Sequence, residues 1–405
     1  MAAPAAELSD NSMFLQKACT VILVTSPIES HPSTELLDRC LSSIIRSFPE
    51  LDGCRIIVAC DGAKCVADGA VKPWRRIFGK TDKATVQKYR GFLESLTARP
   101  WMVCNRPREV FNGNESSLPI PDLETGLEWL GFALTLKRAL GLVTTPTVFV
   151  TCHDFELLPE TLVGVNTREL VDALLANHGN GEESTRTSPC PPNYIGLPTM
   201  KAHSFALRHA EALKGLPLLS LENSSLVLEP MGMWKDSPHF ARTDTYRDLV
   251  FGQAGSEENP RLHVFKRGHF IEDTLGQRMI DALKKAPCAA PLLGAAESTG
   301  QSGGATKAAV FARFGTYLLR CQKPCIYHLD GRVYVPVSKR AAKGYELAEF
   351  ESERAEAARV FVLQRQALIS AEEEESPQSS LQTHRNRNRP QEGVGVSASD
   401  ENCGA

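Results

Sequence analysis

Short apolar segments alternate with amphipathic segments over the first part of the chain, and this alternation constrains the fold more than any other feature. Residues 18–26, 54–60 and 147–151 are rich in β-branched and other apolar side chains, as buried strands are. Residues 33–48 and 84–96 repeat apolar side chains at helical spacing. Strand–helix–strand repetition predicts an α/β architecture with a mostly parallel central sheet flanked by helices.

Two further segments continue the pattern. Residues 101–105 are short and apolar and predict a third strand, and residues 125–143 predict a long helix that leads into the strand at 147–151. Ser33 or Thr34 can cap the helix that begins near residue 35. From residue 166 onward the pattern is less regular.

Polar side chains follow the predicted strands at the points where the strands end. Asp61 and Gly62 follow one strand, and the strand at 147–151 leads into Cys152-His153-Asp154-Phe155-Glu156. Open α/β sheets bind ligands beyond the carboxyl ends of their strands. The sequence therefore predicts a ligand site at this edge, with Asp154 as the best candidate for a metal ligand.

Structural explanations stay open for each of these groups. Asp61 could cap a strand-to-helix turn, His153 could be a packed imidazole, and Asp154 could cap a turn. The Glu272–Asp273 pair starts an apparent helix, where the helix dipole favours acidic side chains. Alternatively, one of these two acids could be a general base that takes a proton from an attacking hydroxyl.

Composition excludes several classes of protein. A net charge of −3 gives no electrostatic reason to expect a nucleic-acid partner. No run approaches the roughly 20 apolar residues of a membrane span, and the N-terminus does not resemble a signal peptide. We therefore expect no transmembrane anchor and a cytoplasmic location. The 12 cysteines lack zinc-site spacing and predict free thiols.

The chain divides into five predicted parts. They are a flexible N-terminus (1–17), a nucleotide-binding α/β half (18–165), an acceptor-side half (166–340) with a flexible insert (293–307), a charged helix (341–374) and a disordered tail (375–405).

Taken in order, the segments resemble one family. Six segments follow one another as in GT-A-fold glycosyltransferases. They are the strand ending in "TSPIES", the strand ending in "CDGAK", the helix with "LKRALGL", the strand ending in "CHDFELLP", and the later "PHFARTDTYRDLVFG" and "GHFIEDTLGQRM". The inverting, family-2-like type is the most similar, over residues 18–335. The resemblance implies a GT-A fold, which has a Rossmann-like central sheet. It also implies an enzyme of hexosyltransferase type that transfers a sugar from a nucleotide-diphosphate donor to an acceptor hydroxyl. It favours a UDP-sugar donor and implies a divalent metal, Mn²⁺ or Mg²⁺.

The resemblance also implies a role for individual residues. Asp273 would be the general base, with Glu272 beside it. The metal ligands would be Asp154 and His328, with Glu156 or His153 as a further ligand, because the segment departs from the family's Asp-x-Asp pattern. The acceptor side would include Trp234 and Arg242. The donor site would be lined by Thr25, Pro27, Glu29, Asp61, Lys137 and Arg138.

Two other functions remain open. A sugar-phosphate nucleotidyltransferase would share the fold, but such enzymes carry a Gly-rich basic loop after the first strand, and "TSPIESHPS" has neither Gly nor Lys. A degenerate transferase fold kept as a binding or scaffolding module is compatible with the altered metal segment. Retention of Asp61, Asp154, Asp273 and His328 together speaks against it.

Overall fold

The computed structural model describes the following residues: 5–28, 30–65, 80–81, 83–98, 109–111, 129–176, 190–199, 208–221, 224–252, 265–287 and 305–329. Contacts divide the chain into two units, 1–365 and 366–405, and all the described residues belong to the first. The predicted strand at 101–105, most of the insert (293–304), the charged helix and the tail lie outside the described residues.

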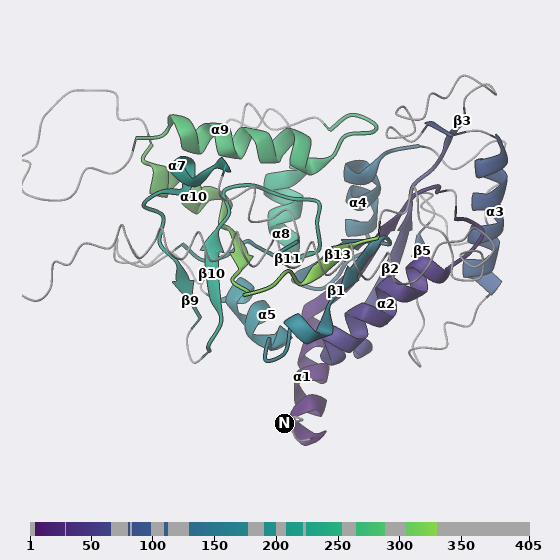
Figure 1. The fold of residues 1–405 in the computed structure, drawn as a ribbon, viewed down its shortest axis with the longest axis horizontal. Helices are drawn as coiled ribbons and strands as arrows, with labels where there is room; N and C mark the ends of the chain where they lie inside the picture. The colour runs from purple at the N-terminus through teal and green to yellow at the C-terminus, as the bar shows by residue number, and fades with distance from the viewer. Residues whose placement is uncertain are drawn as a thin grey trace, which may run out of the picture. The chain divides into compact units, whose positions relative to one another are not determined.

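The amino-terminal half forms the predicted parallel layer (Figure 1). Neighbouring strands lie in the order β5-β2-β1-β6, and all three pairings are parallel. The strands are β1 (Cys19–Thr25), β2 (Arg55–Cys60), β5 (Glu109–Phe111) and β6 (Thr147–Cys152). The described partner of β2 is thus β5, which lies a few residues beyond the segment predicted as the third strand.

The same sheet continues through the second half in the order β6-β11-β8-β12-β10-β9. Only β11 and β10 run against the other seven strands of this nine-stranded sheet, because β11 is antiparallel to β6 and β8, and β10 to β12 and β9. These strands are β8 (Tyr194–Gly196), β9 (Leu219–Ser220), β10 (Val227–Pro230), β11 (His239–Arg242) and β12 (Thr316–Leu319). The two predicted halves therefore share one sheet. Two-stranded sheets pair β7 (Phe155–Leu157) with β13 (Ile326–His328), and β3 (Lys64–Cys65) with β4 (Lys80–Thr81).

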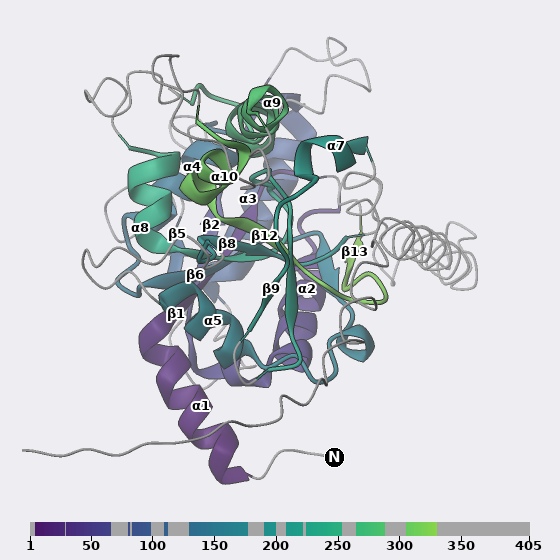
Figure 2. The same cartoon turned by 90° about the vertical axis from the view of Figure 1, so that its left-hand side faces the viewer.

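Helices cover both faces of the sheet. Alternate β1 residues divide between two cores: Leu23 packs with α2 (Glu35–Ser47), α3 (Lys83–Ala98) and α5 (Thr167–Leu175), and Val24 packs with α4 (Phe132–Leu140). Figures 1 and 2 show α4 and α9 on one side of the strands and α2 and α5 on the other. The remaining helices are α1 (Ala5–Ala18), α7 (Ala210–Leu213), α8 (Thr243–Thr245), α9 (Gln277–Lys285), α10 (Lys307–Phe314), the 3₁₀ turns η1 (Pro49–Gly53) and η3 (Pro159–Thr161), and the π-helical turns η4 (Tyr246–Val250) and η5 (Glu272–Gly276).

The N-terminal region predicted to be flexible contains helix α1, so that prediction is wrong. Leu15 is fully buried. Arg168 of α5 donates a hydrogen bond to Asn11 (3.1 Å) and lies over the ring of Phe14, 4.8 Å from its centroid. Contacts with a distant helix stabilise α1, and the local sequence pattern does not reveal them.

Helix α4 begins later than predicted, at Phe132 rather than near residue 125. Gly131 has φ 80° and ψ 169°, a backbone conformation that essentially only glycine adopts. The N–H groups of Leu130 and Gly131 both donate to the Asp61 carboxylate instead of continuing a helix. This contact fixes the start of α4 at the carboxyl end of β2.

Candidate functional site

The carboxyl ends of β1, β2 and β6 lie together at one edge of the sheet. Strand β1 has β2 on one side and β6 on the other, so the chain leaves the ends of β1 and β2 in one direction and enters β6 on the opposite side. Such a reversal of strand order is where open α/β sheets bind their ligands. The polar residues at the ends of these strands are therefore at the position where a site is expected.

The structure brings Asp154 and His328 together, although they are 174 residues apart in the sequence. Nε2 of His328 lies 3.2 Å from Oδ2 of Asp154. Pairing of β7 with β13 places His328 opposite Phe155, and the N–H of Leu329 donates to the Asp154 carbonyl (2.7 Å). The His328 side chain is about half exposed. Both groups predicted as metal ligands thus lie side by side.

Neither candidate for a further metal ligand joins this pair. Glu156 is buried and turned toward α2, where it accepts a hydrogen bond from Arg39 (2.7 Å). The buried His153 ring has Nδ1 3.3 Å from the Val24 carbonyl oxygen, which can only accept, so Nδ1 carries hydrogen there. Across the part of the chain that the structure describes, no group of three or more His, Cys, Asp or Glu side chains could hold a metal ion.

Asp61 connects β2 to the start of α4. Its Oδ1 accepts the N–H groups of Gly62 (2.9 Å) and Leu130 (2.9 Å) and the hydroxyl of Thr135 (3.0 Å). Its Oδ2 accepts the N–H of Gly131 (3.0 Å). Burial raises the pKa of Asp61, and these hydrogen bonds oppose the shift. Asp61 therefore has the structural role that the sequence left open, and Oδ2 retains room for one further donor.

We expect Asp61→Ala to lower the free energy of unfolding by about 3 kcal/mol, because it leaves buried backbone N–H groups without acceptors. Asp61→Asn keeps one acceptor oxygen and should lose about half as much. Urea denaturation of both variants measures the difference. A loss below about 1 kcal/mol in Asp61→Ala would contradict the anchoring role.

The end of β1 and the loop after it contain buried polar atoms without hydrogen-bond partners among the described residues. They are Oγ1 of Thr25 and Oγ of Ser30, and the neighbouring β6 end adds Nε2 of His153. His31 stacks on Phe92 with ring centroids 4.2 Å apart, and burial lowers the pKa values of His31 and His153. Pro27 is half-buried here, and Glu29 lies outside the described residues.

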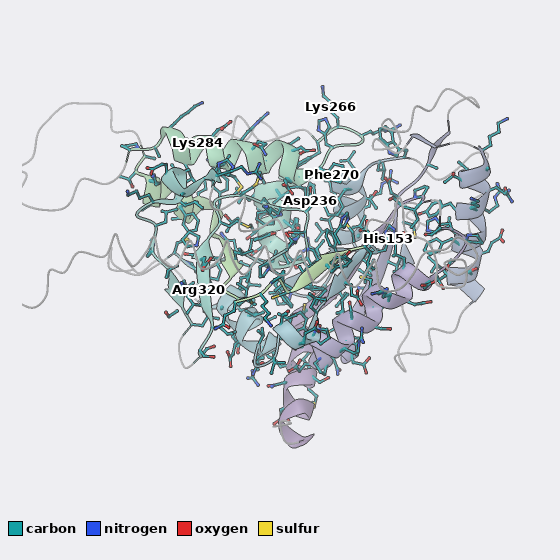
Figure 3. All side chains as sticks on the ribbon, viewed as in Figure 1. His153, Asp236, Lys266, Phe270, Lys284 and Arg320 are labelled. Atoms are coloured by element: carbon teal, nitrogen blue, oxygen red, sulfur yellow. The ribbon has the colours of Figure 1, made fainter. Side chains whose placement is uncertain are left out.

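A second group of acids comes from η5 and from the segment before β11. The side chain of Asp273 is exposed, and Glu272 is half-buried. Asp236, which was not predicted from the sequence, accepts the N–H of Glu272 at Oδ2 (3.1 Å). The signal for it is a short "KDSP" turn directly before a strand. Figure 3 labels Asp236 together with Phe270, whose ring stacks on Phe132 of α4 (6.0 Å).

Trp234 does not lie on an acceptor-side surface, where it was predicted to be. Its side chain is fully buried, packs against Tyr194 and Tyr246, and donates from Nε1 to the Tyr246 hydroxyl (3.3 Å). A sugar cannot reach its ring in this structure, and Trp234 belongs to the core.

Arg242 lies at the opposite edge of the sheet from Asp154. Strand β11 is antiparallel to β6, which places Arg242 beside Thr147, the first residue of β6. Arg242 pairs with Asp244 and donates to the Leu174 carbonyl (3.1 Å). Only the reversed direction of β11 excludes Arg242 from the site, and the sequence does not show that direction.

Lys137 and Arg138 likewise lie away from the carboxyl ends of β1, β2 and β6, near the other end of α4. The helix starts at the edge of the sheet where those strands end and returns toward the beginning of β6, and both side chains belong to its last turn. Nζ of Lys137 lies over the ring of Phe251, 5.9 Å from its centroid. In this structure neither residue is placed beside Asp154.

No family model matches the chain, and no curated protein sequence matches it. Among solved structures, a match is found to S. aureus TarS 1–349, with a TM-score of 0.27 and 15% sequence identity. The match covers 60% of this chain and 52% of that chain, so this chain spans about half the length of the TarS structure. A similarity this low does not bear on function, which has to be argued from the residues of the site.

None of the helices that the structure describes is long and apolar enough to cross a membrane.

Proposed function

We propose that the chain is an inverting glycosyltransferase with a GT-A-like fold. It would transfer a sugar from a nucleotide-diphosphate donor, with UDP-sugar favoured, to an acceptor hydroxyl. The observation that carries the proposal is the 3.2 Å contact between Asp154 and His328 at the reversal of strand order. The sequence resemblance implied both residues as ligands of one metal.

The donor set suits a divalent metal that takes its other ligands from the substrate. Mg²⁺ commonly binds one or two carboxylates together with substrate phosphates and water, and Mn²⁺ accepts carboxylate and imidazole ligands. Asp154 and His328 would supply those two ligands. A bound metal would neutralise charge on the leaving diphosphate. Glu156, paired with Arg39, is not part of this set.

Asp273 would act as the general base. Its side chain is exposed at the start of η5, so an acceptor hydroxyl can approach it. Glu272, next to it, would contact the acceptor. Asp273 would take the proton of the acceptor hydroxyl while that oxygen attacks the anomeric carbon from the face opposite the diphosphate. The buried hydroxyl of Thr25 lies at the start of the segment 25–29 that would line the nucleoside, and the buried hydroxyl of Ser30 lies directly after that segment.

Calorimetric titration with UDP tests the proposal. We expect wild-type protein to bind UDP with Mn²⁺ and to lose most of that affinity in EDTA. Asp154→Ala and His328→Ala should each lose the Mn²⁺-dependent part, about 10-fold or more for a missing ligand. Asp172→Ala, an exposed acid on α5, is the matched control.

The outcomes separate the remaining alternatives. If the UDP affinity does not change in EDTA or in either variant, the protein binds a nucleotide, but Asp154 and His328 do not contribute to that binding. No binding of UDP, GDP or CMP would favour the scaffold function.

A further inference from the structure

The segment 235–237, which carries Asp236, is held by two buried aromatic side chains. The Tyr194 hydroxyl donates to the Lys235 carbonyl (3.2 Å), and Nδ1 of His239 donates to the Ser237 carbonyl (2.6 Å). Tyr194 and His239 are fully buried and stack on each other, with ring centroids 4.4 Å apart. The backbone on both sides of Asp236 is therefore fixed by strands β8 and β11.

A second layer of hydrogen bonds fixes the His239 ring. Nε2 of His239 lies 2.5 Å from the Tyr246 hydroxyl, which also receives the Trp234 indole N–H. Because Nδ1 carries hydrogen toward Ser237, Nε2 must accept, and the Tyr246 hydroxyl donates to it. This network leaves the position of Asp236 little freedom.

Asp236 connects this rigid segment to the two acids of η5. Its Oδ2 accepts the Glu272 N–H (3.1 Å), while Oδ1 is buried and has no partner among the described residues. Gly276 brings η5 close to the residue that precedes this segment, because a Cβ there would lie 2.6 Å from the Trp234 carbonyl oxygen. The π-helical turn that carries Glu272 and Asp273 is thus hydrogen-bonded to Asp236 and also lies against the backbone at Trp234.

We propose that Asp236 is a positioning residue that holds the Glu272–Asp273 turn as a neutral carboxylic acid, with Oδ2 accepting the Glu272 N–H and Oδ1 carrying the proton. The role of the turn in catalysis rests on the proposed function, whereas the protonated state of Asp236 does not.

The surroundings of Asp236 favour the neutral form. The titratable groups that interact with it are Glu272 and Asp273 from η5, Tyr194 from β8, Tyr246 from η4 and Cys152 from β6. Burial raises the pKa values of Tyr194, Tyr246 and Cys152 well above their usual range, so these groups stay neutral at pH 7. Burial raises the pKa of Asp236 well above its usual range, and the charges of Glu272 and Asp273 add to this shift, whereas hydrogen bonds from the N–H groups of Glu272 and Ile271 oppose it.

Stability as a function of pH tests the proton without any substrate. An Asp whose pKa is raised on folding stabilises the protein at low pH, and this contribution is lost as pH rises above the unfolded value near 4. The Tm of Asp236→Asn minus the Tm of wild type should therefore increase from pH 4 upward, by about 1–3 °C per pH unit. Asp172→Asn, an exposed acid, should show no such trend.

Infrared difference spectra give a direct second measurement. We expect a protonated-carboxyl band at pH 7 in wild type that is absent in Asp236→Asn. Absence of that band, or a Tm difference independent of pH, would overturn the neutral acid, whatever the outcome of UDP binding.

Kinetics then test positioning. If sugar transfer is found, Asp236→Ala should lower kcat by about 10²-fold with little change in donor KM. The alkaline fall of kcat/KM in wild type should be missing in Asp236→Asn, because Asn cannot ionise. If kcat/KM of Asp236→Asn still falls at alkaline pH as in wild type, Asp236 does not position the turn. The infrared band and the pH dependence of Tm would still show whether Asp236 is protonated.

Discussion

Replacing Asp273 with Asn is expected to lower kcat for sugar transfer by about 10²–10⁴-fold, the usual contribution of a general base. The side chain is exposed at the first turn of η5 and does not stabilise the core, so the fold and UDP binding should survive. Initial rates with a UDP-sugar, with calorimetry of UDP in parallel, measure both quantities.

Asp281→Asn is the matched control, since Asp281 is an exposed acid two turns further along, on α9. It should keep wild-type kcat. Equal losses in both variants, or loss of UDP binding in Asp273→Asn, would show that Asp273 does not act as the base.

Gly131→Ala is expected to lower the free energy of unfolding by about 4 kcal/mol or more, which combines backbone strain with overpacking. Gly131 has φ 80° and ψ 169°, and an added Cβ would lie 2.5 Å from Cα of Gly268. That contact is with backbone, so no side chain can move aside. The start of α4 would have to shift, and with it the N–H groups that Asp61 accepts.

Gly164→Ala separates strain from close contact. Gly164 also has a positive φ, 84°, but nothing lies within 4 Å of an added Cβ. Gly164→Ala should lower the free energy of unfolding by only about 1–2 kcal/mol, which is the cost of placing a residue with a Cβ at positive φ. Guanidinium denaturation of both variants measures the difference. Similar losses in the two variants would show that the approach of Gly131 to Gly268 is not tight.

The parallel half of the fold could be predicted because its signals are local. Strands β1, β2 and β6 and helices α2 and α3 lie within a few residues of their predicted positions, since buried strands are apolar along their whole length and helices repeat at their own period. The predicted start of α4 is wrong because the N–H group of Leu130 donates to Asp61, which is far away in the sequence. This contact keeps the residues before Phe132 out of the helix.

The site residues also differ in whether local sequence signals or tertiary contacts decide their positions. Asp154 could be named because it follows a strand, and His328 because the resemblance implied it. Arg242 was placed on the wrong edge, because strand direction depends on how β11 pairs with β6. Trp234 was assigned to a sugar-binding surface because burial by Tyr194 and Tyr246 cannot be read from its own segment.

Periodicity and chain order alone determined the α/β class, the succession of the first strands and the edge at which polar residues gather, because these depend on neighbours in the sequence. Tertiary structure alone decided that Asp154 meets His328, that Glu156 turns to Arg39 and that Asp236 holds the N–H of Glu272. These contacts join segments that are 36 to 174 residues apart. Only the packing of the whole sheet brings such segments within hydrogen-bond distance.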